Sequence, residues 1–392
     1  MDKLIILDDL DCFRKRNFII ENFISIERCI ETCKKNTIFV FVIYNNIVYY
    51  RNNSIEDCIK NIVYFNNAKM YILNNKFNFY HISDLERKKI YTQGLFSLKK
   101  DFQFDLNHKY YKTKDYFNKY LNNDENKSKW IYQHYKNLWE YFKLSNYDIT
   151  ECNMNPYDIN WSQPLPTFTK SRRLKIPQMS VLLPLEKLYI PSFYAHILND
   201  DISFHEKENN CVWRGINSGD YFTIKKERAS RKDLVSKFSN HDKFNIGLSC
   251  VKYKEGINEN YIKEAEKHIR SFISTKEQLQ YKYILSVEGN DFATNLCWIM
   301  LSNSVPLMPI PYVETWKLES KLIPYIHYVP LKNDFSDLEK IIDWCNNNQE
   351  KCEYIAFMSK AYALQFFNKE KEEQIIKSVI DFYYEKTHQN VL

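Results

Sequence analysis

Apolar residues recur along the N-terminal part of the chain with spacings that predict both strands and a helix. Residues Leu4–Leu7 form a short apolar run typical of a strand, and apolar residues at helical spacing between Ile19 and Ile30 predict a helix. Segments 38–44, 47–51 and 70–75 are rich in β-branched and aromatic residues and predict further strands. The first hundred residues are therefore expected to form a small α/β unit.

After about residue 205 the pattern becomes an alternation of strand and helix. Strands are expected at 209–215, 281–289, 304–310 and 326–331. Helices are expected at 127–144, at 225–238, at 291–303 for about three turns, at 335–347 after a capping box of Ser336 and Glu339, and at 366–384. Such alternation predicts a parallel sheet with helices on its faces, and hence an α/β protein.

Composition narrows the class of protein. The chain has 392 residues, which favours two domains, and its 44% hydrophobic and 27% charged residues exclude a wholly disordered chain. A net charge of +6, with 55 basic and 49 acidic residues, is too evenly mixed to indicate a nucleic-acid partner. The sequence contains no run of about 18 apolar residues, so we expect no membrane-spanning helix. The N-terminus lacks the basic region and cleavage site of a signal peptide, so we expect a cytoplasmic protein whose ten cysteines are reduced thiols.

The segment Cys211–Gly219 is the first place where chemistry is expected. A strand ends at Arg214, and the turn after it uses two of the six glycines of the chain. Glycines let a loop backbone approach a ligand, and a guanidinium offers a planar fork of donors suited to phosphate. A hairpin turn with a surface arginine explains the same pattern about equally well.

A second candidate is the strand–turn–helix order around Gly289. In a parallel sheet, ligands collect at the carboxyl ends of strands, so backbone amides near Phe292, Ala293 and Thr294 could face a pyrophosphate. Only one glycine is present, so this is not a dinucleotide fingerprint, and an ordinary crossover explains it as well.

A third candidate is a set of basic residues after the first glycine turn, namely Lys225, Lys226, Arg228, Arg231 and Lys232. These side chains could close over an anion, although a solvated surface is the default interpretation of such a run.

Three motifs together resemble the signature of glycosyltransferase family 90. They are WRG followed by a further glycine, then KYILSVEGNDFATNLCWIMLSNSVPLM, then IPYIHYVPLKNDFSDLEKIIDW, in the order and spacing of that family. The resemblance covers about residues 165–365. The family includes lipopolysaccharide-A-type proteins, capsule xylosyltransferases and protein O-glucosyltransferases, and the GNDxATN form resembles its bacterial branch.

The resemblance implies an inverting transfer without a metal ion from a nucleotide sugar, usually a uridine diphosphate sugar. It implies a GT-B-like fold, in which two Rossmann-like domains face each other across a cleft. No cofactor beyond the sugar nucleotide and no metal site is expected, although Asp9 and Asp11 spell an Asp-x-Asp. For His327 and Tyr328, a structural role is expected at least as much as a catalytic role. The expected donor-binding residues are Arg214, Gly215, Ser218, Gly219, Arg228, Arg231, Glu288, Gly289, Asn290, Asp291, Ala293, Thr294 and Asn295.

The sequence departs from the family at two positions. Eukaryotic members place an arginine where this chain has Asn295, so Arg214, Arg228 or Arg231 would have to neutralise the diphosphate. They also place the catalytic aspartate where this chain has Arg173, which cannot act as a base. An inverting transfer needs a carboxylate or histidine near the acceptor hydroxyl. The candidates just before the WRG strand are Asp201, then Asp200, Glu206 and His205, each of which a polar loop also explains.

The sequence therefore predicts a glycosyltransferase acting on a glycan, lipopolysaccharide or capsule-type acceptor. A lipid-linked acceptor would bring peripheral contact with the inner face of a membrane. The alternatives are a protein O-glycosyltransferase and a non-catalytic glycan- or nucleotide-binding relative. The expected division is a small α/β region at 1–100, an acceptor-side α/β domain at 101–200 and a donor-binding Rossmann-like domain with C-terminal helices at 201–392.

Overall fold

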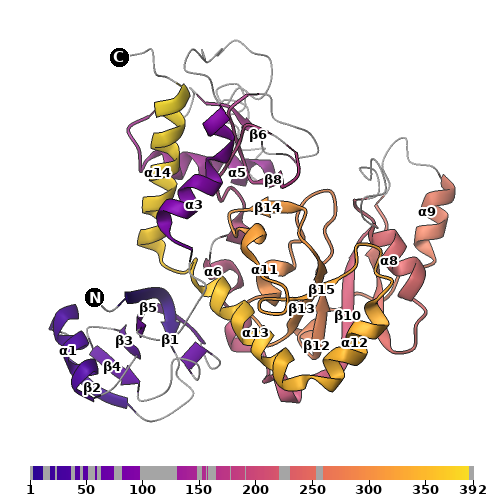
Figure 1. Ribbon diagram of the computed structural model, residues 1–392, viewed down its shortest axis with the longest axis horizontal. Helices are drawn as coiled ribbons and strands as arrows, with labels where there is room; N and C mark the ends of the chain where they lie inside the picture. The colour runs from indigo at the N-terminus through magenta and orange to yellow at the C-terminus, as the bar shows by residue number, and fades with distance from the viewer. Residues whose placement is uncertain are drawn as a thin grey trace.

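A computed structural model shows a mixed α/β protein built around several sheets (Figure 1). The described residues are 3–11, 18–22, 24–36, 40–44, 47–51, 58–59, 63–74, 82–97, 130–147, 152–155, 157, 165–176, 178–189, 191–219, 230–252 and 259–387. None of the helices among them is long and apolar enough to cross a membrane, and each cysteine among them is a free thiol.

An antiparallel sheet of five strands comes first, in the order β1-β5-β3-β4-β2. The strands are β1 (Lys3–Asp11), β2 (Phe18–Asn22), β3 (Val40–Tyr44), β4 (Ile47–Arg51) and β5 (Val63–Asn74). Helix α1 (Ile26–Asn36) buries Cys29 and Cys33 in a cluster that includes Phe41 of β3. The helix predicted from Ile19 is wrong at its start, because Ile19 and Ile20 lie in β2 opposite Tyr50 and Tyr49 of β4. The backbone pairing of this segment with β4 outweighs the helical spacing of its apolar residues.

The middle of the chain and the C-terminal helix share one core. Its elements are α3 (Asp84–Tyr91), η1 (Gln93–Ser97), α5 (Trp130–Phe142), β6 (Met154–Asn155), β7 (Thr167–Thr169), β8 (Ser171–Arg173), β9 (Ser180–Leu182) and α14 (Lys369–Thr387). Strands β6, β7 and β9 form a small parallel sheet, and Phe168 of β7 stacks on Tyr383 of α14 with ring centroids 4.3 Å apart. In Figure 1, α14 lies beside α3 and α5. Arg87 of α3 fixes this helix pair through two bonds to the carboxylate of Glu372, at 2.6 and 2.7 Å.

The second half of the chain forms the predicted parallel sheet. Its strands are β10 (Glu208–Ile216), β11 (Phe244–Cys250), β12 (Tyr281–Leu285), β13 (Val305–Pro309) and β15 (Val329–Leu331), in the order β11-β10-β12-β13-β15. Every neighbouring pair is parallel. The expected alternation of strand and helix is therefore confirmed for this half.

Side chains of these strands alternate between two faces of the sheet. Trp213 and Tyr283 belong to one core with the helices α8 (Arg231–Phe238) and α12 (Leu338–Asn347) and the start of α13 (Gln349–Leu364). Val212 and Ile284, one position away, belong to the other core with α11 (Leu296–Ile299). Burial on both faces accounts for the almost continuous apolar sequence of the strands.

Short elements complete the described chain. They are η4 (Lys187–Tyr189), α6 (Pro191–Tyr194), α7 (Ile197–Asp200), η5 (Phe204–Glu206), α9 (Glu259–Glu266), α10 (Thr275–Gln278), β14 (Val313–Thr315) and η7 (Glu319–Lys321). Strand β14 pairs antiparallel with β8, which links the two halves of the chain.

Two predicted helix starts are wrong. Helix α11 covers four residues rather than three turns, because Asn295 donates to the carbonyl of Leu285 at 2.8 Å and so fixes the preceding loop to the end of β12. Helix α12 begins at Leu338 without a side-chain cap, so Ser336 and Glu339 form no capping box. Before it, buried Phe335 takes a left-handed backbone conformation, with φ of 57°, that redirects the chain.

The buried carboxyl group of Glu319 predicts a pH dependence of stability. Burial raises its pKa to about 7, although Thr315 donates to it from both its backbone N–H and its hydroxyl. The folded state therefore holds a proton that the unfolded state releases near pH 4.5. The free energy of unfolding should fall by about 3 kcal/mol between pH 4.5 and 7 on account of this group.

Chemical denaturation at several pH values measures this effect. Glu319→Gln should reduce the slope of the unfolding free energy against pH, whereas Glu259→Gln, at an exposed position, should leave this slope unchanged. An unchanged slope in Glu319→Gln would assign the pH dependence to other groups.

Candidate functional site

The carboxyl ends of β10 and β12 bring the two predicted glycine turns together. The backbone N–H of Gly219 donates to Oδ1 of Asn290 at 2.9 Å. Gly219 has φ of 102°, which L side chains rarely adopt, and a Cβ there would lie 3.0 Å from the carbonyl carbon of Gly289. The two turns, 70 residues apart in sequence, thus pack backbone to backbone at the edge where parallel sheets bind ligands.

Arg231 is the cation held at this junction. Its Nε and Nη2 donate to the carbonyl of Val287 at 3.0 and 2.8 Å, and its Nη1 donates to Oγ of Ser218 at 2.8 Å. The guanidinium also lies over the ring of Trp213, 5.8 Å from the centroid. Arg231 begins α8, so it bridges both turns and places a partly exposed positive charge beside Gly289.

Gly289 leaves no room for a side chain. A Cβ there would lie 2.4 Å from Oγ of Ser218 and 3.0 Å from Cζ of Arg231. The preceding residue is fixed too, because the carboxylate of Glu288 accepts bonds from the backbone N–H groups of Tyr312 and Val313 at 3.0 and 2.9 Å. The turn is therefore pre-shaped before any ligand enters.

The remaining predicted donor residues occupy different environments. Ala293 is buried, Thr294 is exposed, and Gly215 packs against the ring of Trp213. The amide of Asn295 bonds to the end of β12 and to Ser286, so in this structure it serves the loop rather than an open site. Arg228, like Lys225 and Lys226, lies outside the described residues.

Arg214 points away from this junction. Its guanidinium donates to Oδ1 and the carbonyl of Asn245 at 2.7 and 2.9 Å and, through Nε, to the carbonyl of Ser271 at 3.0 Å. Asn245 lies near the start of β11, so the side chain runs back along the sheet. These contacts favour a structural role for Arg214 and leave Arg231 as the described arginine beside the glycine turns.

The three carboxylates predicted as bases lie at the opposite edge of the sheet. Asp201 is buried and pairs with buried Lys207, which precedes β10, and it accepts a bond from the N–H of Asn303, which precedes β13. Glu206 caps η5 through bonds to Ser203, and exposed Asp200 ends α7. All three therefore lie near the amino ends of the strands, where these contacts favour a structural role; exposed His205, beside Glu206, lies there as well.

An ionic cluster that is largely buried lies next to the Gly289 turn, at the carboxyl edge of the parallel sheet. Nζ of Lys170 lies 2.6 Å from Oε1 of Glu186 and 3.3 Å from Oδ2 of Asp291, and Nε2 of His134 lies 3.7 Å from the same Glu186 oxygen. Lys170 directly follows β7 of the smaller sheet, so the cluster joins that sheet to the loop after β12. The sequence analysis did not single out Lys170 or Glu186. The available signal was the position of Lys170, three residues before Arg173, where the family places its catalytic aspartate.

His327 lies in the core, where its contacts favour a structural role. It is fully buried, its Nδ1 accepts the N–H of Ile323 at 3.0 Å, and burial lowers its pKa to about 4. It is thus a neutral ring in the core beside Tyr362, at a ring-centroid distance of 4.9 Å.

Comparison with known proteins finds a family model and several relatives that match this chain. The family model described as glycosyl transferase family 90 matches residues 196–387. O-glucosyltransferase LpsA of Dichelobacter nodosus is 35% identical over 242 residues, which cover 62% of this chain and 68% of that protein. Protein O-glucosyltransferase 3 of Rattus norvegicus is 37% identical over 78 residues, 20% of this chain and 15% of that protein. Uncharacterized protein 179R of Invertebrate iridescent virus 6 is 32% identical over 143 residues, 31% of this chain and 12% of that protein.

Proposed function

The chain belongs to glycosyl transferase family 90 and is a glycosyltransferase. On this premise, we propose that it transfers a sugar from a uridine diphosphate sugar, with inversion at the transferred sugar. The proposed acceptor is a glycan, lipopolysaccharide or capsule-type molecule. The observation that carries the proposal is the meeting of Gly219, Gly289 and Arg231 at the carboxyl edge of the parallel sheet. Two close backbones and a guanidinium suit a diphosphate.

The donor diphosphate would lie over the Gly289 turn. Arg231 would neutralise its charge, a task for which the neutral amide of Asn295 is unsuited. The guanidinium has five N–H donors in a planar fork, so one arginine can hold both the protein loops and a phosphate oxygen. The negative charge that develops on the leaving diphosphate would then be stabilised by this cation and by backbone amides, without a metal ion.

We propose that the acceptor enters between the two parallel sheets, in a GT-B-like arrangement. The cluster of Lys170, Glu186 and Asp291 supports this placement, because it joins the smaller sheet to the donor loop. Asp291 is our first choice for the group that takes the acceptor proton, since it lies two residues from Gly289. Asp201, Asp200 and Glu206 remain the alternatives from sequence.

The names of two relatives favour one transferred sugar, and two classes of acceptor remain candidates. Two of them are named O-glucosyltransferases, which favours glucose as the transferred sugar. One of these two is named a protein O-glucosyltransferase, so a protein hydroxyl is the second candidate acceptor. A peripheral contact with a membrane would suit a lipid-linked glycan.

Calorimetry with uridine diphosphate tests the donor site. Arg231→Ala should weaken binding by about tenfold to a hundredfold, since a hydrogen bond to a charged group contributes about 1.5–3 kcal/mol. Arg231→Lys should lose nearly as much, because a point charge does not reproduce the fork. Arg214→Ala is the matched control and should bind like wild type.

Two results would overturn parts of this proposal. Weaker binding in Arg214→Ala with unchanged binding in Arg231→Ala would move the diphosphate to the other face of β10. Tight binding of uridine diphosphate glucose without release of uridine diphosphate, when a panel of glycan acceptors is supplied, would favour the non-catalytic alternative.

A further inference from the structure

The corner between helices α12 and α13 brings two cysteines together. Cys345 lies in the last turn of α12 and Cys352 in the first turn of α13, and Asn348 ends one helix and begins the next. A straight helix would hold these cysteines about two turns apart. At the corner, the thiol of Cys352 instead donates to the carbonyl of Cys345, with 3.6 Å between sulfur and oxygen.

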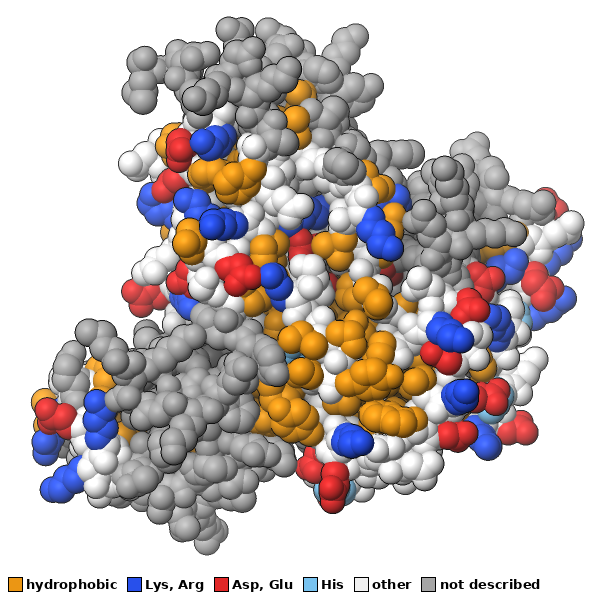
Figure 2. Space-filling view, viewed as in Figure 1, with side chains coloured by type: hydrophobic (Ala, Val, Ile, Leu, Met, Phe, Trp, Pro, Cys, Tyr) orange, Lys and Arg blue, Asp and Glu red, His pale blue; other side chains and the backbone are white. Residues whose placement is uncertain are grey.

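Both thiols are fully buried in the core that α12 and α13 form with the parallel sheet. A third cysteine, Cys211 of β10, belongs to the same core. Figure 2 shows hydrophobic side chains gathered on the face of the molecule where α13 lies. A bulky or charged oxidant is therefore kept from the two thiols, whereas a small neutral oxidant can reach them during brief local openings of the fold.

The two sulfurs differ in reactivity, because only a thiolate attacks an oxidant. As a thiolate, Cys352 accepts a hydrogen bond from the Cys345 thiol, and this bond lowers the pKa of Cys352. The same bond raises the pKa of Cys345. The ammonium of Lys282 lowers the pKa of Cys352 further. This ammonium is fixed by the amide oxygens of Asn209 and Gln349, at 2.6 and 2.7 Å. Cys352 is therefore the sulfur that reacts first, with Cys345 beside it as the second thiol.

We propose that Cys345 and Cys352 are a reversible redox pair, which hydrogen peroxide converts into a disulfide that joins α12 to α13. The thiolate of Cys352 attacks one peroxide oxygen, the O–O bond breaks, and the hydroxide that leaves takes up the thiol proton to form water. The sulfenic acid on Cys352 then reacts with the Cys345 thiol. The S–S bond forms, the S–O bond breaks and a second water leaves. The two sulfurs lose two electrons in total, and the peroxide oxygens gain them.

The redox pair is separate from the proposed donor site. Lys282 lies near the start of β12, whereas the Gly289 turn follows the end of that strand. The corner is nevertheless anchored to the strand, because the hydroxyl of Tyr283 donates to Oδ1 of Asn346 at 2.9 Å and accepts from Nε2 of Gln349 at 2.6 Å. Oxidation of the pair needs neither a sugar nucleotide nor an acceptor.

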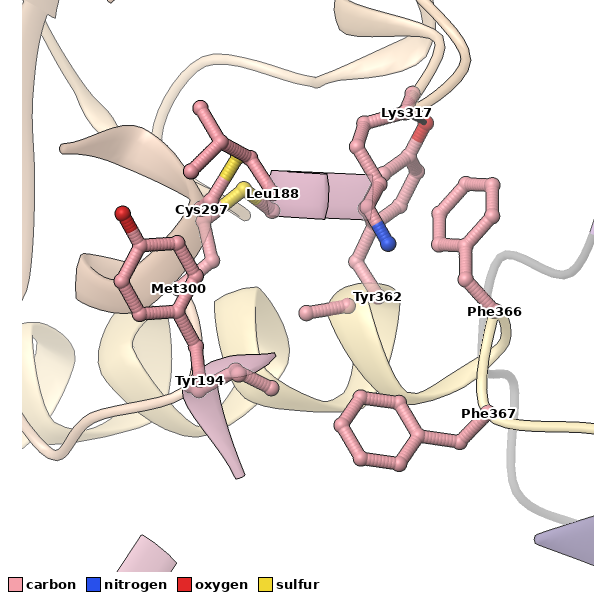
Figure 3. Close-up of a pocket in the computed structure, with 10 residues that line it drawn as sticks. Leu188, Tyr194, Cys297, Met300, Lys317, Tyr362, Phe366 and Phe367 are labelled. Carbon is pink, nitrogen blue, oxygen red and sulfur yellow. Dashed lines mark hydrogen bonds between the residues drawn. The ribbon is translucent and has the colours of Figure 1, made fainter. Parts of the chain in front are cut away.

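Two other cysteines serve as references for this chemistry. Cys297 lines a cavity of about 30 Å³, where Figure 3 shows it beside Leu188, and no other cysteine is among the residues that line this cavity. Cys250 is exposed at the end of β11. Neither thiol should enter a disulfide within the folded chain under conditions that oxidise the pair.

Peptide mapping of the full chain tests the proposal. Trypsin cleaves after Lys351, which lies between the two cysteines, so it places Cys345 in the peptide 341–351 and Cys352 in the peptide 352–360. The folded chain is treated with hydrogen peroxide, catalase removes the excess, and iodoacetamide blocks the remaining thiols before digestion. The two peptides should be recovered as one linked species, which dithiothreitol separates again.

Single variants test the order of the steps. In Cys345→Ala, the sulfenic acid of Cys352 has no second thiol to react with, so dimedone should label it once the oxidised sample is unfolded. In Cys352→Ala, dimedone should not label Cys345. Cys250→Ser removes an exposed thiol and is the matched control, which should give the linked peptides like wild type.

Several results would overturn the proposal. They are the absence of linked peptides from wild type at millimolar peroxide, linkage of either cysteine to Cys211 in place of the pair, and linkage that appears only after the chain is unfolded in urea. Dimedone on Cys345 but not on Cys352 would overturn the assigned order of attack. The map of wild type decides the main point even where a cysteine variant fails to fold. None of these results bears on donor binding, which the Arg231 variants measure separately.

Discussion

Gly289→Val is expected to abolish sugar-nucleotide turnover while leaving the parallel sheet folded. Even the first carbon of a side chain at this position would lie 2.4 Å from Oγ of Ser218 and 3.0 Å from Cζ of Arg231. It would therefore displace the arginine from both turns and fill the surface that a diphosphate must approach. Misplacing a reacting group by about 1 Å can cost a hundredfold in rate, so a loss of at least about a hundredfold is expected.

A pair of smaller substitutions separates blocking from local strain. Gly289→Ala introduces only the clashing carbon, and Ser218→Ala removes the nearest atom that it meets. If the added Cβ acts by pushing Ser218 and Arg231 apart, the double variant that combines Gly289→Ala with Ser218→Ala should recover stability. If it also blocks the ligand, uridine diphosphate binding should stay weak in the double variant. Wild-type donor affinity in Gly289→Val would place the diphosphate elsewhere.

The parallel sheet was predictable because its strands carry their own signal. Segments such as Val305–Pro309 and, apart from Lys282, Tyr281–Leu285 are short apolar runs, because side chains on both faces of these strands are buried. The N-terminal sheet was predicted less well, because Ile19 and Ile20 fit both a helix and a strand until the pairing partner β4 is known.

The position of Arg214 shows what a sequence motif leaves undetermined. The motif places the arginine correctly at the end of a strand, next to the glycine turn. Side chains alternate along a strand, however, and Trp213 faces the helix that supplies Arg231. Arg214 must therefore face the other side, where it meets Asn245. Strand parity was available from the sequence, but the helix that would bring the second arginine was not.

The candidate bases illustrate a different limit. Asp200, Asp201 and Glu206 precede the WRG strand in sequence, and this was the reason for choosing them. In a parallel sheet, residues that precede one strand lie at the edge opposite to residues that follow it, and Asp201 bonds to Asn303, which precedes β13. The ionic pairing of Asp291 with Lys170, 121 residues away, depends on tertiary contacts that no local pattern reveals.

Asp291, the proposed base, lies in the loop that carries the Gly289 turn. It follows Gly289 by two residues and is buried, and its Oδ2 lies 3.3 Å from Nζ of Lys170. Lys170 also lies 2.6 Å from Glu186, so the carboxylate faces the half of the chain that carries the smaller sheet. The proposed mechanism needs a base in this position, between the proposed donor turn and the half of the chain that is proposed to receive the acceptor.

Asp291→Asn should lower kcat by about two to four orders of magnitude, the usual contribution of a general base. The amide keeps the size of the side chain but cannot take a proton. Uridine diphosphate affinity should change by less than about twofold, since the diphosphate is proposed to bind to Arg231 and the glycine turns. Glu186→Gln, on the other side of Lys170, is the matched control and should retain more activity than Asp291→Asn.

Asp201→Asn should produce the opposite pattern. The substitution leaves the buried ammonium of Lys207 without its carboxylate partner, which typically costs about 3–5 kcal/mol of stability. Turnover per folded molecule should nevertheless stay near the wild-type value, as it should in Asp200→Asn and Glu206→Gln. Steady-state kinetics combined with thermal unfolding of the same samples distinguishes the two sites. A loss of kcat in Asp201→Asn at wild-type stability, with an active Asp291→Asn, would return the base to the segment before β10.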